Sequence, residues 1–214
     1  MTVTVYGAPY SVYVRIVRLA LEEKGVAYRL EEVDIFADGG PPERHLARHP
    51  FSKIPAFDHD GFGLHETGAI TRYVDATFEG PPLFPSDLKS AARTNQIMSI
   101  VDSYAYTSLV WGVYTGAVAD LRDGETRDEA AIAAAVQRSR RCLGVISDLR
   151  GESPWLAGDN VSLADLYLAP MMGYFLVADD GKELWQEITG LHDWWAAMTA
   201  RSSMKDTRAN DMVA

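Results

Sequence analysis

The first 80 residues combine short runs of alternating or apolar residues with stretches of helical periodicity. The run TVTVY at 2–6 alternates with a period of two, which predicts a strand. In SVYVRIVRLALEEKG, at 11–25, apolar residues recur on one helical face, and Gly25 stands where a helix commonly ends. The chain is therefore expected to open with a strand followed by a helix.

A second strand, a hairpin and a further helix are predicted between residues 27 and 78. AYRLEEVDI at 27–35 is the second strand, and PAFDHDGFGLHE at 55–66 is a hairpin that turns at Asp60-Gly61, ahead of a helix in TGAITRYVDATF. Between them, FADGGPPERHLARHP at 36–50 predicts a loop with a short helical turn. A strand-helix-strand unit gives a parallel pair of strands, to which the hairpin adds antiparallel ones.

The chain after residue 87 is helical almost throughout. After a Pro- and Gly-rich linker at 80–87, we predict helices at 88–121, 127–150, 162–178, 182–189 and 190–202. The sequence VSLADL marks a helix start, in which Ser162 and Asp165 cap each other's amides while Val161 contacts Leu166. We interpret this box as purely structural.

The composition excludes several classes of protein. Of 214 residues, 47% are hydrophobic and 23% charged, which is ordinary for a globular chain. A net charge of −10 repels the phosphates of nucleic acid and anionic lipid. No apolar run approaches the ~20 residues of a membrane span, and MTVTVYGAPY resembles no signal peptide. We therefore expect a cytoplasmic protein that binds neither nucleic acid nor a membrane.

The cysteine and histidine content limits the chemistry further. Cys142 is the only cysteine, which excludes an intrachain disulfide, a CxxC redox pair and a thiolate metal cluster. We interpret the five histidines as structural or surface residues and assign no metal. Any thiol chemistry must therefore use a thiol that comes from outside the chain.

Three motifs occur in the chain in a fixed order: SKIPAF at 52–57, ETGAITRYV at 66–74 and SLAD at 162–165. Together with the order of elements, they resemble the cytosolic glutathione S-transferases, and among these the serine-type classes (phi-like and theta-like) of bacterial type. The resemblance covers essentially the whole chain. It implies a thioredoxin-like α/β glutathione-binding domain at 1–79, a linker at 80–87, and an all-α domain at 88–214 with the hydrophobic substrate pocket.

The resemblance implies that glutathione binds around the predicted hairpin. The family pairs the cysteinyl amide of glutathione with backbone beside a cis-proline, which here is Ile54-Pro55. Glu66 would bind the γ-glutamyl ammonium, and Thr67 with the helix-terminal amides would bind the γ-glutamyl carboxylate. Lys53 would bind a second carboxylate, the glycyl one, unless it is a solvated surface lysine.

One part of glycyl recognition departs from the family pattern. Members of this type often carry basic residues after the second strand, where this chain has Gly40-Pro41. Arg44 or His45 could substitute.

Ser11 matches the catalytic serine of the serine-type classes, at the end of the first strand and the start of the first helix. Lowering a thiol pKa of ~8.5 by two units requires about 2.7 kcal/mol, and one hydroxyl hydrogen bond to a thiolate supplies ~1.5–3 kcal/mol. Ser11 could instead be only an N-cap. Tyr6 is the main rival, because tyrosine-type members use a tyrosine near that position, and Tyr10 and Tyr13 could also reach the sulfur.

The pocket for the second substrate is less clearly marked. Aromatic residues that could line it, or could equally pack in the core, are Tyr10, Tyr13, Tyr104, Tyr106, Trp111 and Tyr114. Asp102 lies in the same segment as the last four. In some family members an aspartate there approaches the glutathione ammonium across the dimer.

We therefore expect a glutathione S-transferase that uses glutathione as co-substrate, without a metal, against a small apolar electrophile. The resemblance also implies a homodimer and a detoxification-like role. A non-catalytic binding protein of the same fold is one alternative, and a glutathione-dependent isomerase or peroxidase is another. The sequence YSVYV lacks the cysteine that isomerase members carry near the first helix.

Overall fold

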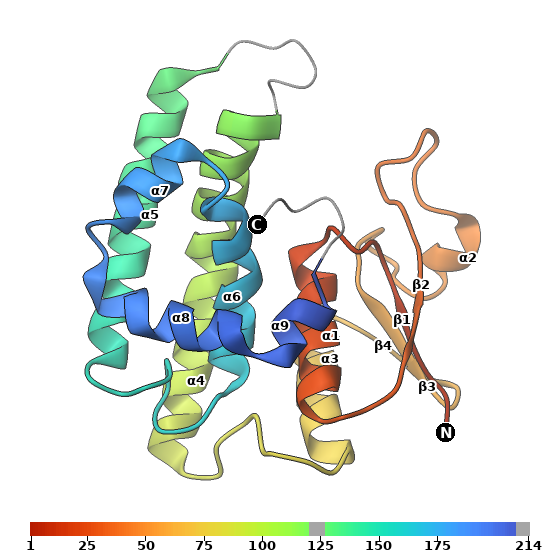
Figure 1. Cartoon of the computed structure of the whole chain (residues 1–214). Helices are drawn as coiled ribbons and strands as arrows, with labels where there is room; N and C mark the ends of the chain where they lie inside the picture. Colours follow the sequence, from red (N-terminus) through yellow and green to blue (C-terminus); the bar gives the residue numbers. More distant parts are fainter. Residues whose placement is uncertain (120–126, 209–214) are drawn as a thin grey trace. The chain divides into compact units, whose positions relative to one another are not determined.

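The computed structural model describes residues 1–119 and 127–208. Within these residues the sheet has four strands in the order β2-β1-β3-β4 (Figure 1). In chain order they are β1 Val3–Tyr6, β2 Arg29–Glu31, β3 Ala56–His59 and β4 Phe62–His65. β2 is parallel to β1, and β3 is antiparallel to both β1 and β4, which confirms the predicted unit and hairpin. β2 is shorter than expected because its partner β1 ends at Tyr6, opposite Glu31.

Helices cover both faces of this sheet. α1 (Val12–Glu23) and α3 (Thr67–Thr77) pack together on one side, and the short α2 (Glu43–Leu46) lies on the other (Figure 1). The core between the sheet and the two long helices includes the fully buried side chains of Val5, Val14, Ile16, Ile70 and Val74. This arrangement is the thioredoxin-like α/β architecture that the resemblance implied.

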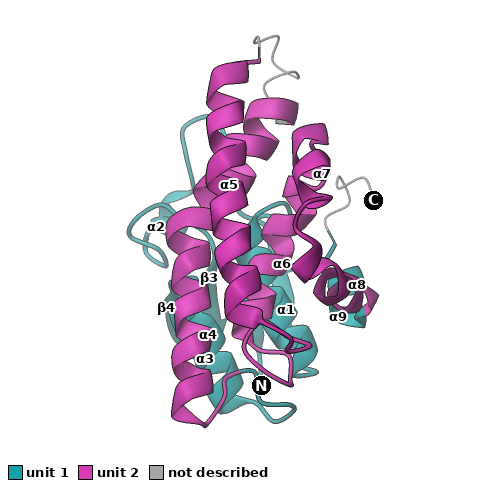
Figure 2. Cartoon of the chain, turned by 90° about the vertical axis from the view of Figure 1, so that its left-hand side faces the viewer, with its two compact units in different colours: residues 1–83, 201–211 teal, residues 84–200, 212–214 magenta. Residues whose placement is uncertain are grey.

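The described residues divide into two compact units, 1–83 with 201–208 (unit 1) and 84–200 (unit 2), shown in Figure 2. Unit 2 is helical, and its elements are α4 Leu88–Ile100, η1 Val101–Ala119, α5 Glu129–Arg150, α6 Leu163–Phe175, α7 Asp179–Trp185, η3 Thr189–Leu191 and α8 His192–Ala200. These confirm the predicted helices to within a few residues at their ends. Residues 120–121 of the first predicted helix lie outside the described residues.

The segment η1 continues α4 but has π-type hydrogen bonding. Its fully or nearly fully buried positions recur every fourth residue, a wider repeat than the 3.6 residues per turn of an α-helix, at Val101, Ala105, Leu109, Val113 and Ala117. A second four-residue series is small: Ser108, Gly112 and Gly116. A Cβ on Gly112 would lie 2.5 Å from the Cβ of Ala135, so this series allows α5 to pack closely on η1.

Residues 201–208, which the sequence interpretation included in the helical domain at 88–214, cluster with unit 1. α9 (Ser202–Asp206) packs against α1. Arg15 Nη2 of α1 donates to the Met204 carbonyl at 2.9 Å, and Arg18 Nη1 donates to the Thr207 carbonyl at 3.1 Å. Both arginine side chains are buried.

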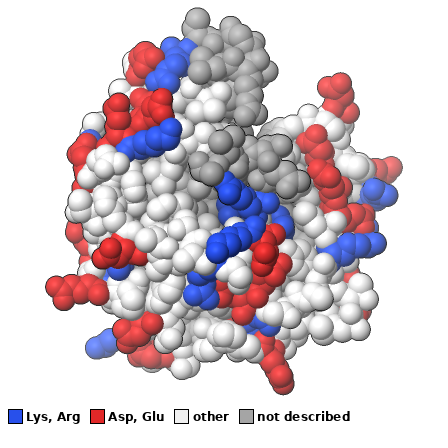
Figure 3. Space-filling view, in the orientation of Figure 1, with Lys and Arg blue, Asp and Glu red and all other residues white. Residues whose placement is uncertain are grey.

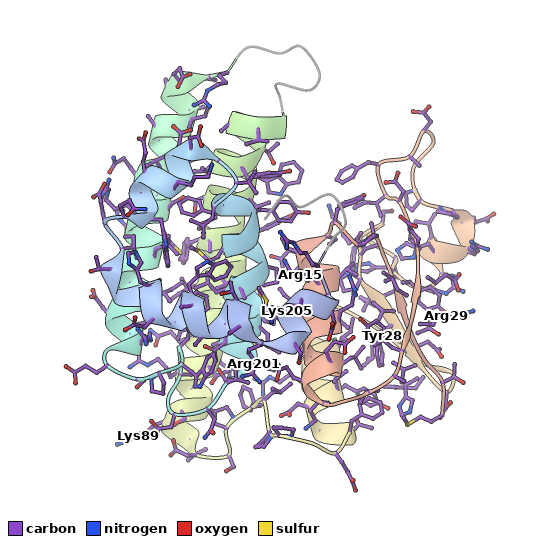
Figure 4. All side chains as sticks on the ribbon, in the orientation of Figure 1. Arg15, Tyr28, Arg29, Lys89, Arg201 and Lys205 are labelled. Carbon is purple, nitrogen blue, oxygen red and sulfur yellow. The ribbon has the colours of Figure 1, made fainter. Side chains whose placement is uncertain are left out.

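Further polar contacts tie the same segment to the other end of α1. Arg201 Nε donates to Glu23 Oε1 at 2.7 Å, and the Ser203 hydroxyl donates to the same oxygen at 2.5 Å. Figure 4 shows Arg15, Arg201 and Lys205 around α9. Basic and acidic side chains meet on this part of the surface (Figure 3). We call the contacts of residues 201–208 with α1 the C-terminal clamp.

Of the helices described, none combines the length and the apolar character needed to span a membrane.

Candidate active site

Ser11 is the N-cap of α1. Its backbone is extended (φ −71°, ψ 126°), and its hydroxyl oxygen accepts a hydrogen bond from the Val14 amide at 3.4 Å. The side chain is half-buried. Because the oxygen accepts this bond, the hydroxyl proton is still free to be donated elsewhere. The capping role and a donor role are therefore compatible in one side chain.

Gly7 brings the start of α1 close to the hairpin. A Cβ at this position would lie 2.4 Å from Val14 Cγ2 and 3.3 Å from the Cβ of Ile54. The turn after β1 therefore passes directly between the first turn of α1, which Ser11 caps, and the segment before Pro55. The sequence interpretation did not single out Gly7, and only the spatial contact reveals its importance.

The peptide bond between Ile54 and Pro55 is cis, as the resemblance implied. The ladder between β1 and β3 pairs Tyr6 with Ala56, and Ile54 lies beyond this last pair. The side chain of Ile54 is 8% exposed and that of Pro55 is buried. The side chain of Ile54 is thus packed into the unit, while its main chain lies outside the paired part of the sheet.

Glu66 and Thr67 lie at the start of α3. Glu66 is the N-cap, with φ at 71°, a left-handed backbone that few residues other than glycine adopt. Its side chain is exposed, whereas Thr67 is 8% exposed. Strained backbone of this kind is commonly retained at ligand sites. Both residues stand beside β4, whose last residue, His65, pairs with Ala56.

The basic residues before Ile54 have different surroundings. Lys53 and Arg44 are exposed, so both could meet a carboxylate in solution. His45 is not such a surface group: its side chain is fully buried, and its Nε2 lies 2.7 Å from the Lys53 carbonyl oxygen. The proposal that His45 substitutes as a partner of the glycyl carboxylate is therefore wrong, because the ring already has a backbone partner.

The three tyrosines near Ser11 are held in different ways. Tyr10 is 37% exposed and its hydroxyl donates to Asp34 Oδ1 at 3.1 Å. Burial, then the hydrogen bond and the charge of Asp34, raise the pKa of Tyr10 to about 12. Tyr6 is 8% exposed and lies under the guanidinium of Arg48, whose Cζ is 4.0 Å from the ring centroid. Tyr13 is half-buried.

Two of these contacts were absent from the sequence interpretation. Asp34 also accepts a hydrogen bond from the Phe36 amide at 2.8 Å, which fixes the turn after β2 next to Tyr10. Arg48 lies 42 positions from Tyr6 in the chain (48 − 6), so no local spacing indicates their contact.

The aromatic residues of η1 belong to unit 2. Tyr104 and Trp111 are 63% and 47% exposed, and the Trp111 ring makes an edge contact with Tyr106. Tyr114 packs on Tyr174 of α6, with ring centroids 4.7 Å apart. Their part in an electrophile pocket stays a prediction. Asp102 is exposed on the same segment, and its role across a dimer also stays a prediction.

Among the described residues, no group of three or more histidine, cysteine or acidic side chains is arranged to hold a metal ion. His45 and His49 do stand four residues apart, a spacing that the sequence interpretation overlooked.

The Cys142 thiol is buried, and burial raises its pKa to about 12.

Comparison with known proteins shows the family to which the chain is similar. Residues 5–82 match the model of the glutathione S-transferase N-terminal domain, and residues 129–197 match that of the C-terminal domain. The chain is 30% identical to the probable glutathione S-transferase GSTF1 of Oryza sativa subsp. japonica, over 97% of this chain and 95% of that protein. It is 29% identical to glutathione S-transferase F6 of Arabidopsis thaliana, over 94% and 96%.

The fold agrees with these matches. The crystal structure of glutathione transferase F7 from Populus trichocarpa superposes with a TM-score of 0.85 at 26% identity, covering 96% of this chain and 97% of that one. The chain therefore belongs to the glutathione S-transferase family and is an enzyme of that family. The expected fold, a thioredoxin-like domain followed by a helical domain, is confirmed.

Proposed function

We propose that this protein is a serine-type glutathione transferase, in which Ser11 stabilises the thiolate of glutathione for attack on an apolar electrophile. The observation that carries the proposal is the position of Ser11 at the N-terminus of α1, with its oxygen accepting from the Val14 amide. The hydroxyl proton can then be donated to a sulfur bound at this helix end. The family of the chain supports glutathione as the co-substrate.

The energetics of this arrangement are sufficient. A thiol of pKa ~8.5 must be stabilised as its thiolate by about 2.7 kcal/mol to ionise two pH units lower. A hydrogen bond to a charged group contributes ~1.5–3 kcal/mol, and a helix N-terminus contributes ~0.3–1 kcal/mol. Ser11 and α1 together therefore reach the required stabilisation without a further cation.

The remaining site residues fit the parts of glutathione. The main chain of Ile54 lies beyond the last pair of the β1–β3 ladder and would pair with the cysteinyl unit. The exposed Glu66 would bind the γ-glutamyl ammonium, while Thr67 and the first amides of α3 would bind the carboxylate. Lys53 is exposed and would bind the glycyl carboxylate.

In the reaction, the thiol proton leaves to solvent and the sulfur keeps the electron pair. Ser11 donates its proton in a hydrogen bond to the sulfur without transferring it, so the charge is stabilised until the new carbon–sulfur bond forms. The electrophile either loses a leaving group with the bonding electrons or takes up a proton after addition. The hydroxyl is unchanged at the end of the cycle.

Of the neighbouring tyrosines, Tyr10 and Tyr6 are less suitable donors. The Tyr10 hydroxyl already donates to Asp34, and its pKa of about 12 is well above that of a thiol. Tyr6 is buried beneath Arg48.

We also propose, with the family as support, that the enzyme is a cytoplasmic homodimer. Sedimentation of the purified chain measures its oligomeric state directly.

The test combines calorimetry of glutathione binding with the ultraviolet absorbance of the bound thiolate. We expect the natural protein to bind glutathione with a thiolate signal at neutral pH. Ser11→Ala should keep binding, lose the signal and lose about 100-fold in turnover of an activated aryl chloride. Ser11→Thr, which keeps a hydroxyl, should retain most of both.

Each contrary result has a distinct meaning. A thiolate signal that persists in Ser11→Ala would remove Ser11 from the mechanism. No binding at millimolar glutathione would overturn the proposed function. Binding by the natural protein without any turnover would favour a non-catalytic protein of this fold. Because Ser11→Ala also loses an N-cap worth ~1 kcal/mol, its thermal midpoint is measured in parallel.

A further inference from the structure

Three imidazole rings form a group on α2, on the turn that follows it and on β4. The rings of His45 and His49 have centroids 6.3 Å apart, and those of His49 and His65 are 4.9 Å apart. His45 is fully buried and His49 is 3% exposed. The ring of Phe51 makes edge contacts with His49 and His65. We call this group the histidine cluster.

The hydrogen bond of His45 fixes which of its nitrogens carries the proton. Nε2 lies 2.7 Å from the Lys53 carbonyl oxygen, and a carbonyl can only accept, so Nε2 is the donor. The buried Nδ1 has no hydrogen-bond partner among the described residues. His45 therefore donates one hydrogen bond, to the carbonyl of the residue directly before Ile54.

The main chain connects the other members of the cluster to the same place. The His49 amide donates to the His45 carbonyl at 2.8 Å, and the Ser52 amide donates to the His49 carbonyl at 3.0 Å. Ser52 has a positive φ of 57°. The turn from α2 to Lys53 is thus closed by backbone bonds at His49 and held at its end by the His45 ring.

The surroundings of His49 disfavour a positive charge. Burial, and then the charges of His65 and His45, lower the pKa of His49 below its ordinary 6.5, while the charge of Glu66 and a backbone hydrogen bond oppose the shift. The Nδ1 of His49 is buried without a partner among the described residues, and so is Nη1 of Arg48, a cation on the same turn. A protonated His49 would therefore be a buried charge without a hydrogen-bond partner at Nδ1 among the described residues.

We propose that His45 is a positioning residue for the main chain that binds glutathione, and that a proton on the histidine cluster releases this main chain. The proposal rests on the proposed function, because it takes Ile54 as the partner of glutathione. When His49 is protonated it leaves its buried place, the turn closed by its backbone opens, and the bond from His45 to Lys53 is lost. Glutathione affinity then falls with the fraction of molecules in the closed form.

The probe for the test is S-methylglutathione, which has no thiol to ionise, so any pH dependence of its binding between about pH 5 and about pH 7.5 belongs to the protein. For the natural protein we expect the dissociation constant to rise about fivefold over this range as the pH falls, with a midpoint below 6.5. His49→Gln, which cannot titrate, should reduce this rise to less than about twofold.

The positioning role is tested at neutral pH by two variants at one site. His45→Phe fills a similar volume without a donor and should weaken binding about tenfold, whereas His45→Gln keeps a donor and should stay within about twofold of the natural protein. The matched control is His192→Gln. His192 Nε2 makes the same kind of bond, to the Trp185 carbonyl at 2.8 Å, but in unit 2, so binding should not change.

Amide hydrogen exchange of residues 43–54 is a readout that needs no ligand. His45→Phe should accelerate exchange there about tenfold, and His45→Gln should not. Affinity that is independent of pH, or equal weakening by His45→Gln and His45→Phe, would overturn the proposal. If the probe does not bind the natural protein while exchange follows the expected pattern, the proposed function fails and the role of His45 is limited to anchoring the turn.

Discussion

In unit 2 the single carboxylate of Asp165 accepts four hydrogen bonds, whereas the C-terminal clamp of unit 1 uses several side chains of α1. Asp165 is fully buried at the start of α6. Its Oδ2 accepts from the Ser162 amide at 2.7 Å and the Ser162 hydroxyl at 2.8 Å. Its Oδ1 accepts from the Leu156 amide at 2.8 Å and Trp194 Nε1 at 2.9 Å. The clamp is only partly buried, with Arg201 31% exposed.

The two anchors differ in how far apart their partners lie in the sequence. Ser162 and Asp165 are three positions apart, so the chain brings them together as soon as α6 forms. The clamp joins residues 178 to 192 positions apart, which meet only when the chain end returns to α1. The two anchors also differ in burial, which determines how much free energy of unfolding the loss of each one should cost.

The largest effect is expected for Asp165→Ala. Removing this carboxylate leaves the donors of Leu156 and Trp194 buried without an acceptor, a loss of about 4 kcal/mol in the free energy of unfolding. Urea denaturation measures it, with Asp159→Ala, at an exposed position four residues before Leu163, as control. If Asp165→Ala costs no more than Asp159→Ala, the carboxylate is not the anchor of unit 2.

A second comparison asks whether close packing matters as much as the polar anchor in unit 2. Gly112→Ala would place a Cβ 2.5 Å from that of Ala135, and overpacking of this kind costs about 2 kcal/mol. Gly144→Ala on α5 meets no heavy atom within 4 Å and should stabilise the protein by ~0.5 kcal/mol or more. Thermal unfolding of the two variants should therefore shift in opposite directions; a shift in the same direction would contradict the four-residue packing of η1.

Glu23→Gln tests the clamp, where exposure predicts a smaller loss of about 1 kcal/mol at neutral pH. Burial opposes ionisation of Glu23, but hydrogen bonds from Arg201 and Ser203 outweigh it and lower the pKa of the carboxyl below its ordinary 4.5. A lowered pKa in the folded state means that the stabilisation is present above pH 4.5 and is lost as the pH falls through the folded value.

The measurement is urea denaturation of Glu23→Gln and the natural protein at neutral pH and at about pH 3. The difference between the two proteins should be largest at neutral pH and should shrink in acid. A difference that stays constant over this range would show that the charge of Glu23 does not hold the clamp.

The sequence was most informative where partners are close in the chain. It predicted the parallel pair of strands, the helix starting at Ser11, the hairpin and the Oδ2 half of the Asp165 anchor, because periodicity and capping are local signals. It missed the Oδ1 half, with Trp194, because nothing within α6 indicates a donor 29 positions away. The contacts of residues 201–208 with α1 were missed for the same reason.

The candidate site shows the same division. Ser11, Pro55 and Thr67 stand at element ends, which the sequence marks with caps and a proline. The partners of two rival tyrosines are distant in the chain: Asp34 accepts a hydrogen bond from Tyr10, and the guanidinium of Arg48 covers the ring of Tyr6. No local signal in the sequence indicates these contacts, which the proposal for Ser11 uses.

The smallest effect on stability is expected for Tyr10→Phe, because the hydrogen bond that it removes is the most exposed one in this series. Its hydrogen bond to Asp34 is solvent-exposed, so its loss should cost less than about 1 kcal/mol of stability. The bound thiolate signal should stay within about twofold of the natural protein, because a phenol that donates to a carboxylate does not also donate to sulfur. Alkaline titration by tyrosinate absorbance should show a group near 12 that disappears in Tyr10→Phe. Loss of the thiolate signal in Tyr10→Phe, as large as in Ser11→Ala, would make Tyr10 the activating residue and Ser11 only its neighbouring cap.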